Sequence, residues 1–145
     1  MPSIKDIMET NVITLETHKT VYDAAVLMTE KKRGCLIITE GLVPVGIITE
    51  RDIVRRFVYQ NFLQRETKIS EIMSKPLVTI DPDSSLREAA RVMVKNAIRR
   101  LPVIKDNKLV GIITTSDFAR HLSKKSTTEK MFEAMARYPQ VSTSY

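Results

Sequence analysis

Tryptophan is absent from the chain, and cysteine, histidine and glycine are scarce, at one, two and four residues out of 145. The single cysteine, Cys35, excludes an internal disulfide framework and is typical of a protein from a reducing compartment. No apolar run approaches the roughly 20 residues that a membrane-spanning helix needs. The first ten residues also lack the basic-then-apolar order of a secretion signal. We therefore expect a soluble, cytoplasmic protein without a membrane partner.

Residues suited to catalysis or to metal binding are also few. His18 and His121 stand in unrelated contexts, and Cys35 is followed by Leu-Ile-Ile, which is typical of a buried core thiol. The chain has no Cys-x-x-Cys, His-Glu-x-x-His, P-loop or Gly-x-Ser-x-Gly motif. The sequence thus predicts a protein that is not an enzyme, with no catalytic residues and no metal site of its own.

Basic residues exceed acidic ones by 23 to 17, which leaves a formal net charge of +6. Such a bias suits a phosphate-bearing partner, although solvated lysines also account for it. Basic runs at 31–33 and 124–125 make nucleic acid an alternative partner. The lack of tryptophan, the aromatic content of 6% and the absence of a recognition motif count against it. A basic nucleic-acid-binding module, or a protein-interaction module without nucleotide sensing, stays open as the alternative function.

The chain contains an internal duplication. Shifting it by 65 residues aligns 4–58 with 69–123 without a gap. The matched pairs include Ile4 and Ile69, Met8 and Met73, Thr14 and Thr79, Ala24 and Ala89, Met28 and Met93, Gly46 and Gly111, Thr49 and Thr114, Asp52 and Asp117, and Arg55 and Arg120. An offset that holds over this length indicates two copies of one structural unit.

Each copy predicts the order strand, helix, strand, strand, helix. The first strands are expected at 12–15 and 77–80, and apolar residues at helical spacing follow them. Ser85 with Glu88, and more weakly Thr20 with Asp23, mark the helix starts as capping boxes. Two short apolar runs then form a hairpin in each copy. We expect the first repeat at 1–60, a linker at 61–68, the second repeat at 69–124 and a tail at 125–145.

A last amphipathic helix is predicted at 127–137. Met131 and Met135 lie along one side of it, together with Phe132 or Ala134. This stripe could cover the core or meet a second copy of the chain, and the sequence leaves both open.

The phrase Thr-x-x-Asp occurs at the same place in both repeats, where the last strand meets the second helix. Thr49 and Thr114 are good N-caps, and Asp52 and Asp117 would stabilise the helix starts as acids in the first turn. On this interpretation the phrase is purely structural.

The alternative interpretation is a ligand site at each helix start. Unpaired N–H groups at a helix N-terminus can hold a phosphate, and a nearby carboxylate can accept hydrogen bonds from a ribose diol. Gly46 and Gly111 remove a side chain where a flat base could approach the backbone. Together these features favour a nucleotide.

These residues carry a family resemblance. The phrase h-G-h-h-T-x-x-D at 45–52 and 110–117, the "IRRLPV" at 98–103, and the openings from Met to Thr at 8–14 and 73–79 resemble a tandem pair of cystathionine beta-synthase (CBS) domains. The resemblance covers about residues 3–123. It implies an α/β (α+β) fold, a stand-alone Bateman module in which two CBS-type β-α-β-β-α repeats pack with pseudo-twofold symmetry, plus the C-terminal helix.

The resemblance also implies a function and a set of site residues. Such modules bind adenosine compounds (AMP, ADP, ATP or S-adenosylmethionine) in clefts between the repeats. The implied contacts are Asp52 and Asp117 to ribose, Thr49 and Thr114 to phosphate, Val12, Ile13, Thr14, Val78 and Thr79 to adenine, and Arg100 to phosphate in the second site.

The two implied sites differ. The first repeat has Cys35 where the second has Arg100, and Arg51 could partly compensate where the second repeat has Ser116. We therefore expect the site built on Thr114 and Asp117 to be favoured.

The resemblance implies no obligatory cofactor, although a nucleotide could bring its own Mg²⁺. The expected mechanism is a population shift, in which the ligand favours one arrangement of the clefts and a partner polypeptide responds to it. The module is expected to pair into a disc-like homodimer.

Overall fold

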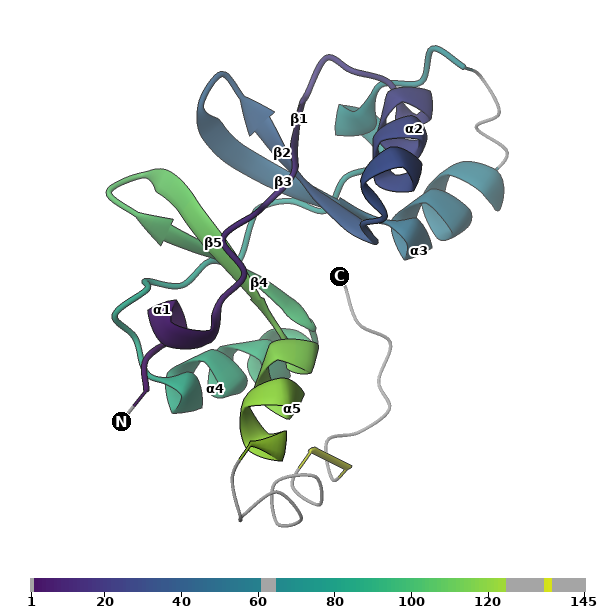
Figure 1. The fold of residues 1–145 in the computed structure, drawn as a ribbon. Coiled ribbons are helices and arrows are strands. Elements are labelled where there is room, and N and C mark those ends of the chain that lie inside the picture. The colour runs from purple at the N-terminus through teal and green to yellow at the C-terminus, as the bar shows by residue number, and fades with distance from the viewer. Residues whose placement is uncertain (1, 61–64, 125–134, 137–145) are drawn as a thin grey trace. The chain divides into compact units, whose positions relative to one another are not determined.

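The computed structural model describes residues 2–60, 65–124 and 135–136, and the chain forms two compact units (Figure 1). We call the unit that contains the described part of 11–77, together with the turn at 106–109, the first-repeat unit. The second-repeat unit contains residues 2–10, 78–105 and the described residues from 110 onward.

The first-repeat unit has a three-stranded sheet in the order β1-β2-β3, in which β2 runs parallel to β1 and antiparallel to β3. Its elements are β1 (Thr14–Glu16), α2 (Val21–Lys31), β2 (Cys35–Glu40), β3 (Val43–Thr49), α3 (Glu50–Asp52) with its π-helical continuation η1 (Ile53–Val58), and the short 3₁₀ helix η2 (Ile69–Glu71). The predicted strand-helix-strand-strand-helix order is present in this unit.

The apolar spacing of α2 explains how its face meets the sheet. Val21, Ala24 and Met28 recur at i, i+3 and i+7, so they project from one side of the helix and are buried. They form a core cluster with alternate strand residues Leu36 and Ile38, whose side chains point to the same face of the sheet. Helices α2 and α3 lie on one side of the strands (Figure 1).

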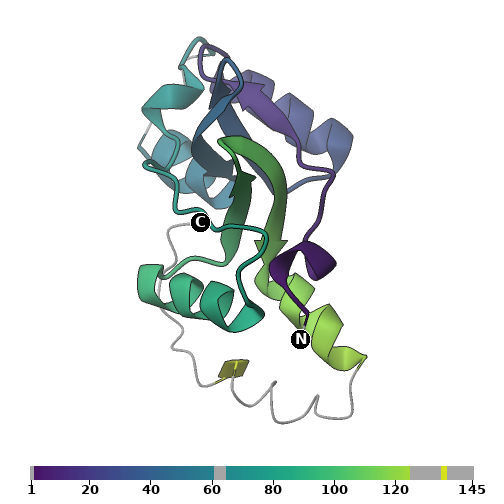
Figure 2. The ribbon, with the colours of Figure 1, turned by 90° about the vertical axis from the view of Figure 1, so that its left-hand side faces the viewer.

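The second-repeat unit has the same helices and hairpin. Its elements are α1 (Ile4–Ile7), α4 (Leu86–Asn96), β4 (Arg100–Lys105), β5 (Lys108–Thr114) and α5 (Thr115–Ser123). Asp106 and Asn107 form a two-residue turn with φ angles of 50° and 63°, the left-handed conformation that twisted hairpins favour. Helix α1 lies beside α5 (Figures 1 and 2).

The strand predicted at 77–80 is reduced in the structure to one parallel bridge, between Ile80 and Val103. In the first repeat, the N–H of Ile37 donates to the carbonyl of Ile13 at 3.1 Å and extends the parallel ladder. The matching position in the second repeat is Pro102, which has no N–H to donate. Proline therefore shortens the ladder that the periodicity predicts.

The opening segments of the two repeats are exchanged between the units. Glu9 and Ile112 exchange two backbone hydrogen bonds of 2.9 Å, so the opening segment of the first repeat pairs with the edge of β5. Ser74 and Ile47 pair likewise, at 2.8 and 3.1 Å, so the opening segment of the second repeat joins β3. The two compact units therefore do not contain the same residues as the two repeats of the sequence.

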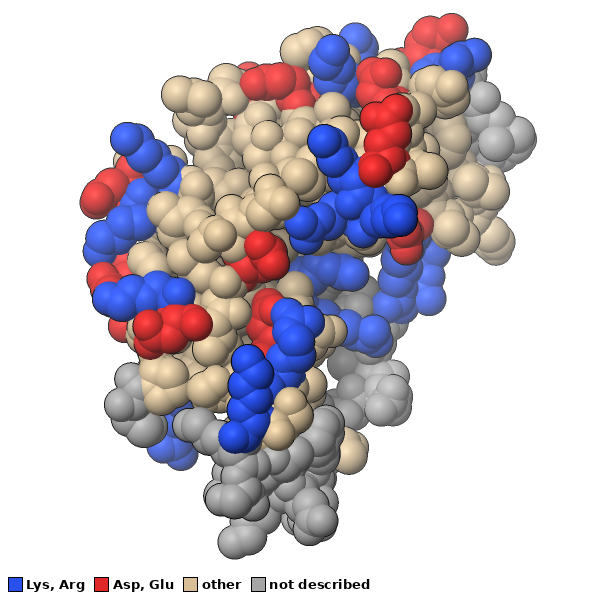
Figure 3. Space-filling view, in the orientation of Figure 1, with Lys and Arg blue, Asp and Glu red and all other residues tan. Residues whose placement is uncertain are grey.

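The predicted helix at 127–137 lies outside the described residues except for Met135 and Ala136, which are helical. Within the described part of the chain, no helix is long and apolar enough to span a membrane. On the face that Figure 3 shows, Asp and Glu side chains lie among the Lys and Arg side chains, as on an ordinary solvated surface.

Candidate functional site

Both Thr-x-x-Asp phrases form capping boxes at the starts of α3 and α5. The N–H of Thr49 donates to Asp52 Oδ2 at 3.0 Å, and the N–H of Asp52 donates to Thr49 Oγ1 at 3.1 Å. The corresponding distances for Thr114 and Asp117 are 2.8 and 3.3 Å. The structural role of the phrase is therefore present in both repeats.

The two carboxylates are buried, with exposures of 5% for Asp52 and 4% for Asp117. Each has an arginine at its second oxygen. Arg120 Nη2 donates to Asp117 Oδ1, and Arg56 Nε lies 3.7 Å from Asp52 Oδ1. In each carboxylate, Oδ2 accepts the hydrogen bond of the helix cap and Oδ1 faces the arginine. A ribose diol that bound at Oδ1 would therefore share this oxygen with the arginine.

These two arginines are not among the site residues predicted from the sequence. Arg120 matches Arg55 in the duplication, and it stands three residues after Asp117, a spacing that brings side chains together on a helix. In the first repeat, the arginine that faces the carboxylate is Arg56, at the next position. The helical spacing was a usable signal for both.

In the first-repeat unit, the segment 12–14 and the helix cap at Thr49 lie at the same end of the sheet. Thr14 pairs with Ile37, two residues from Cys35, which pairs with Thr49. Val12 and Ile13, which precede this pairing, are partly exposed, and Thr14 is exposed. The first-repeat unit therefore brings together the segment assigned to adenine and the cap assigned to phosphate. Arg51 follows the cap and is partly buried.

The second-repeat unit groups its predicted residues similarly. The N–H of Thr115 donates to the carbonyl of Arg99 at 3.0 Å, which places the start of β4, and with it Arg100, beside the cap at Thr114. Arg100 is partly exposed and Ser116 is exposed. Val78 and Thr79, assigned to adenine, immediately precede the bridge from Ile80 to β4; Val78 is partly exposed and Thr79 is exposed.

The glycines serve a different purpose from the one inferred from the sequence. A Cβ atom added at Gly46 would lie 2.5 Å from Met73 Sδ, and one added at Gly111 would lie 2.6 Å from Met8 Sδ. Each glycine thus makes room for the methionine of the exchanged opening segment. The space that we assigned to an approaching base is occupied by a thioether.

Across residues 2–60 and 65–124, no three His, Cys, Asp or Glu side chains are grouped so that they could hold a metal ion. The chemistry available at the helix starts is therefore that of backbone amides, hydroxyls, buried carboxylates and guanidinium groups.

Each of the two repeats matches a known domain family. The family model of the CBS domain matches the chain twice, at residues 4–59 and 69–124. The chain belongs to the CBS domain family. It carries a tandem CBS module, a regulatory nucleotide-binding fold, and CBS pairs are generally non-catalytic.

Relatives share both the sequence and the fold. The CBS domain-containing protein YhcV of Bacillus subtilis is 40% identical over 119 residues, which is 82% of this chain and 84% of that protein. Four other curated relatives are longer, and this CBS pair spans between 42% and 60% of their lengths.

Solved structures of related proteins superimpose closely. The CBS domain pair of protein MJ0100, solved with 5'-methylthioadenosine and S-adenosyl-L-methionine, matches with a TM-score of 0.77 and 31% identity, over 86% of this chain and 99% of that one. The hexameric CBS-CP12 protein from bloom-forming cyanobacteria matches with a TM-score of 0.76 and 37% identity, over 88% and 74% of the two chains.

Proposed function

We propose that this CBS pair is a sensor that binds adenosine compounds (AMP, ADP, ATP or S-adenosylmethionine) at its capped helix starts. The observation that carries the proposal is the repeated arrangement of a buried carboxylate, an arginine and a helix N-terminus in both repeats. The complexes of MJ0100 support the choice of ligand class. The sensor acts in the cytoplasm on another polypeptide, and any Mg²⁺ arrives with the nucleotide.

In this proposal, each Asp accepts hydrogen bonds from ribose hydroxyls, and each cap threonine, with the first N–H groups of its helix, holds phosphate. The segments 12–14 and 78–79 line the adenine. The site at Asp117 binds more tightly, because Arg100 adds a cation beside the cap where the first repeat has Cys35. Ligand binding shifts the population of module conformations, and the partner polypeptide prefers one of them.

A binding panel on the Asp117→Ala variant tests the proposal. Loss of a carboxylate that accepts from a diol is expected to weaken the best adenosine ligand by about 10- to 100-fold, the range for hydrogen bonds to a charged group. Isothermal titration calorimetry with AMP, ADP, ATP, S-adenosylmethionine and NAD measures the effect.

The chain offers a matched control for the lost helix cap. Thr20 and Asp23 form the same capping box at the start of α2, with distances of 3.0 and 3.1 Å. Asp23→Ala should cost a similar cap energy of about 0.5–2 kcal/mol and leave the affinity unchanged. Equal affinities of Asp117→Ala and wild type would remove the ribose role. Binding to RNA or DNA with a steep salt dependence and no response to nucleotides would favour the alternative function.

We further propose that the chain forms a homodimer through the first-repeat unit. Helix α2 and the continuation of α3 expose apolar side chains that the second repeat replaces with polar or small ones. The exposed residues are Tyr22 (49%), Val26 (37%), Val54 (59%), Val58 (52%) and Tyr59 (85%), and their counterparts are Arg87, Arg91, Ala119, Ser123 and Lys124. Several exposed apolar side chains on two helices of one unit are typical of an interaction face.

Placing a charge on this face tests the dimer. Val54→Glu should weaken dimerisation by at least about tenfold, since burying an unpaired carboxylate costs more than 1.4 kcal/mol. Sedimentation equilibrium measures the dissociation constant. Val94 on α4 is exposed to a similar degree, 45%, so Val94→Glu serves as the control. An equal loss in both variants, or no dimer in wild type, would contradict this interface.

A further inference from the structure

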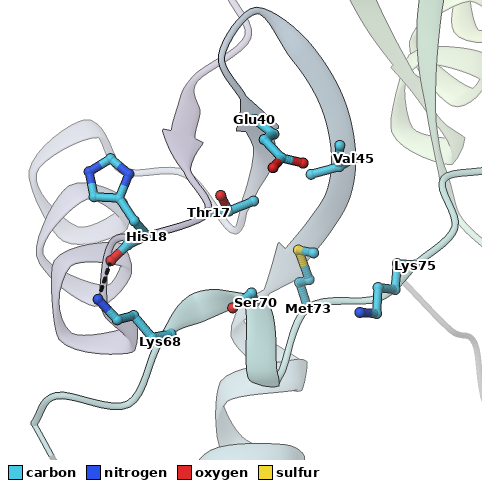
Figure 4. A pocket seen from close by; sticks show the side chains of 8 residues that line it. All are labelled: Thr17, His18, Glu40, Val45, Lys68, Ser70, Met73 and Lys75. Carbon is cyan, nitrogen blue, oxygen red and sulfur yellow. Dashed lines mark hydrogen bonds between the residues drawn. The ribbon is translucent and has the colours of Figure 1, made fainter.

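A pocket opens in the first-repeat unit, away from the capped helix start. Its volume is about 540 Å³, and it lies where β2 ends and β3 begins (Figure 4). Glu40, which lines it, pairs with Val43 beside the hairpin turn, whereas Thr49 pairs with Cys35 at the other end of β2. Cys35 and Glu40 are the first and last residues of β2, so the pocket and the predicted nucleotide-binding residues occupy opposite ends of one sheet.

A network of ion pairs occupies the matching place in the second-repeat unit. Lys5 Nζ lies 3.0 Å from Asp83 Oδ1, and Lys105 Nζ lies 3.1 Å from Asp83 Oδ2 and 3.7 Å from Asp81 Oδ2. These contacts tie the opening segment to the hairpin and to the turn before α4. Hydrogen bonds from Lys5 and then Lys105 lower the pKa of Asp83, so the network is charged at neutral pH.

The first repeat lacks three of the four charges of this network. The residues 65 positions away from Lys5, Asp83 and Lys105 are Ser70, His18 and Glu40, whereas the counterpart of Asp81 is Glu16. A serine cannot pair with an imidazole as lysine pairs with a carboxylate, and glutamate at position 40 reverses the sign of the hairpin residue. All three replacements line the pocket, so the pocket lies where the two repeats differ in charge.

The pocket walls combine an apolar floor with charges of both signs. Met73 is buried and Val45 is partly buried, whereas Lys68, Lys75 and Glu40 are exposed at the rim (Figure 4). Lys68 Nζ donates to the carbonyl of His18 at 3.1 Å, which holds its ammonium group at the edge of the pocket. Among the described residues, neither Lys75 nor Glu40 makes an ion pair in the structure.

We propose that this pocket binds a small zwitterion of the amino acid class. The carboxylate of such a ligand pairs with the ammonium group of Lys75, and its ammonium group pairs with Glu40. An aliphatic side chain covers the floor formed by Met73 and Val45. The volume falls within the range of about 300–1,000 Å³ that is usual for small-molecule sites.

Restoring the ion pairs of the second repeat provides the test. The triple variant Ser70→Lys, His18→Asp and Glu40→Lys transfers the network into the first repeat and fills the pocket. Titration of ¹⁵N-labelled protein with L-leucine, followed by amide chemical shifts, should give saturable shifts at Val45 and Met73 in wild type. The triple variant should bind at least about tenfold more weakly, as expected when the charged contacts and the space are both lost.

Two half-ligands test the requirement for both charges. 4-Methylpentanoate keeps the carboxylate and aliphatic chain of leucine, and isopentylamine keeps the amine and the chain, so both should bind at least about tenfold more weakly than leucine. Glu40→Gln tests the same contact without rebuilding the pocket, should the triple variant fail to fold. It should weaken leucine more than 4-methylpentanoate.

Three outcomes would overturn the proposal: no saturable shift with any of the 20 common amino acids at millimolar concentration, equal binding of 4-methylpentanoate and leucine, or unchanged leucine binding in a folded triple variant. Leucine binding should persist in Asp117→Ala. A failure of the adenosine proposal therefore leaves this one standing, and the reverse also holds.

Discussion

Substituting Ile4→Ala is expected to lower the free energy of unfolding by about 2–5 kcal/mol, the usual cost of truncating a fully buried isoleucine. Ile4 is 0% exposed and belongs to the opening segment that packs in the second-repeat unit, where its N–H donates to the carbonyl of Ser84 at 3.2 Å. The loss of stability should therefore appear mainly in α4, β5 and α5, although Ile4 belongs to the first repeat in the sequence. Hydrogen exchange with mass spectrometry, alongside denaturant unfolding, measures both the size and the place of the effect.

Ile69→Ala is the matched counterpart. Ile69 occupies the same position of the duplication, is also 0% exposed, and packs in the core cluster of the first-repeat unit. Its substitution should lower protection in α2, β2 and β3 instead. If each variant lost protection chiefly in the repeat that contains the substituted residue in the sequence, the exchange of opening segments would be refuted.

Gly111→Ala is expected to destabilise the protein by about 1–3 kcal/mol through overpacking. The added Cβ would lie 2.6 Å from Met8 Sδ and 2.9 Å from the backbone oxygen of Glu9. The thioether can move aside, but the backbone oxygen belongs to the pairing between Glu9 and Ile112. The second substitution Met8→Ala should therefore restore little stability to Gly111→Ala.

The destabilisation by Gly46→Ala should be relieved when the neighbouring methionine is removed, in contrast to that by Gly111→Ala. The new Cβ would lie 2.5 Å from Met73 Sδ, but the nearest backbone oxygen, that of Ser74, is 3.1 Å away. Met73→Ala removes the worst contact, so a double-mutant cycle should show favourable coupling of about 0.5–3 kcal/mol here and little at Gly111. Urea unfolding of wild type and of the six variants in the two cycles measures both couplings. Equal coupling in the two repeats would contradict the assigned backbone clash.

Much of this fold could be predicted because its signals are local. The helix starts at Thr20, Thr49, Ser85 and Thr114 each accept a hydrogen bond from the backbone N–H three residues later, as the spacing of their side chains predicts. Asp106 and Asn107 form the predicted hairpin turn. The family was recognisable because the Thr-x-x-Asp phrase recurs in register, and the family comparison confirms it.

The rest depends on contacts that periodicity does not encode. An opening segment has the same apolar pattern whichever unit it joins, so the pairing of Glu9 with Ile112 could not be read from the chain. The shortened ladder at Pro102 was accessible in principle, because proline lacks the donor N–H. The sequence suggested that Gly46 makes room for a base, whereas in the structure it makes room for Met73. The lack of a side chain does not reveal which neighbour needs the space. The ligand contacts of Asp52 and Asp117 remain predictions.

The crossing of the opening segments has a consequence for how this duplication can be divided. A fragment that ends near residue 60 would keep residues 2–10, whose packing partners lie in the missing copy. It would also leave unpaired the edge of β3 that pairs with Ser74. Excising one copy by its sequence boundaries therefore produces two incomplete pieces. Only a rearranged gene, with residues 67–77 joined to the first copy and residues 2–10 to the second, would encode halves that each contain their own packing partners.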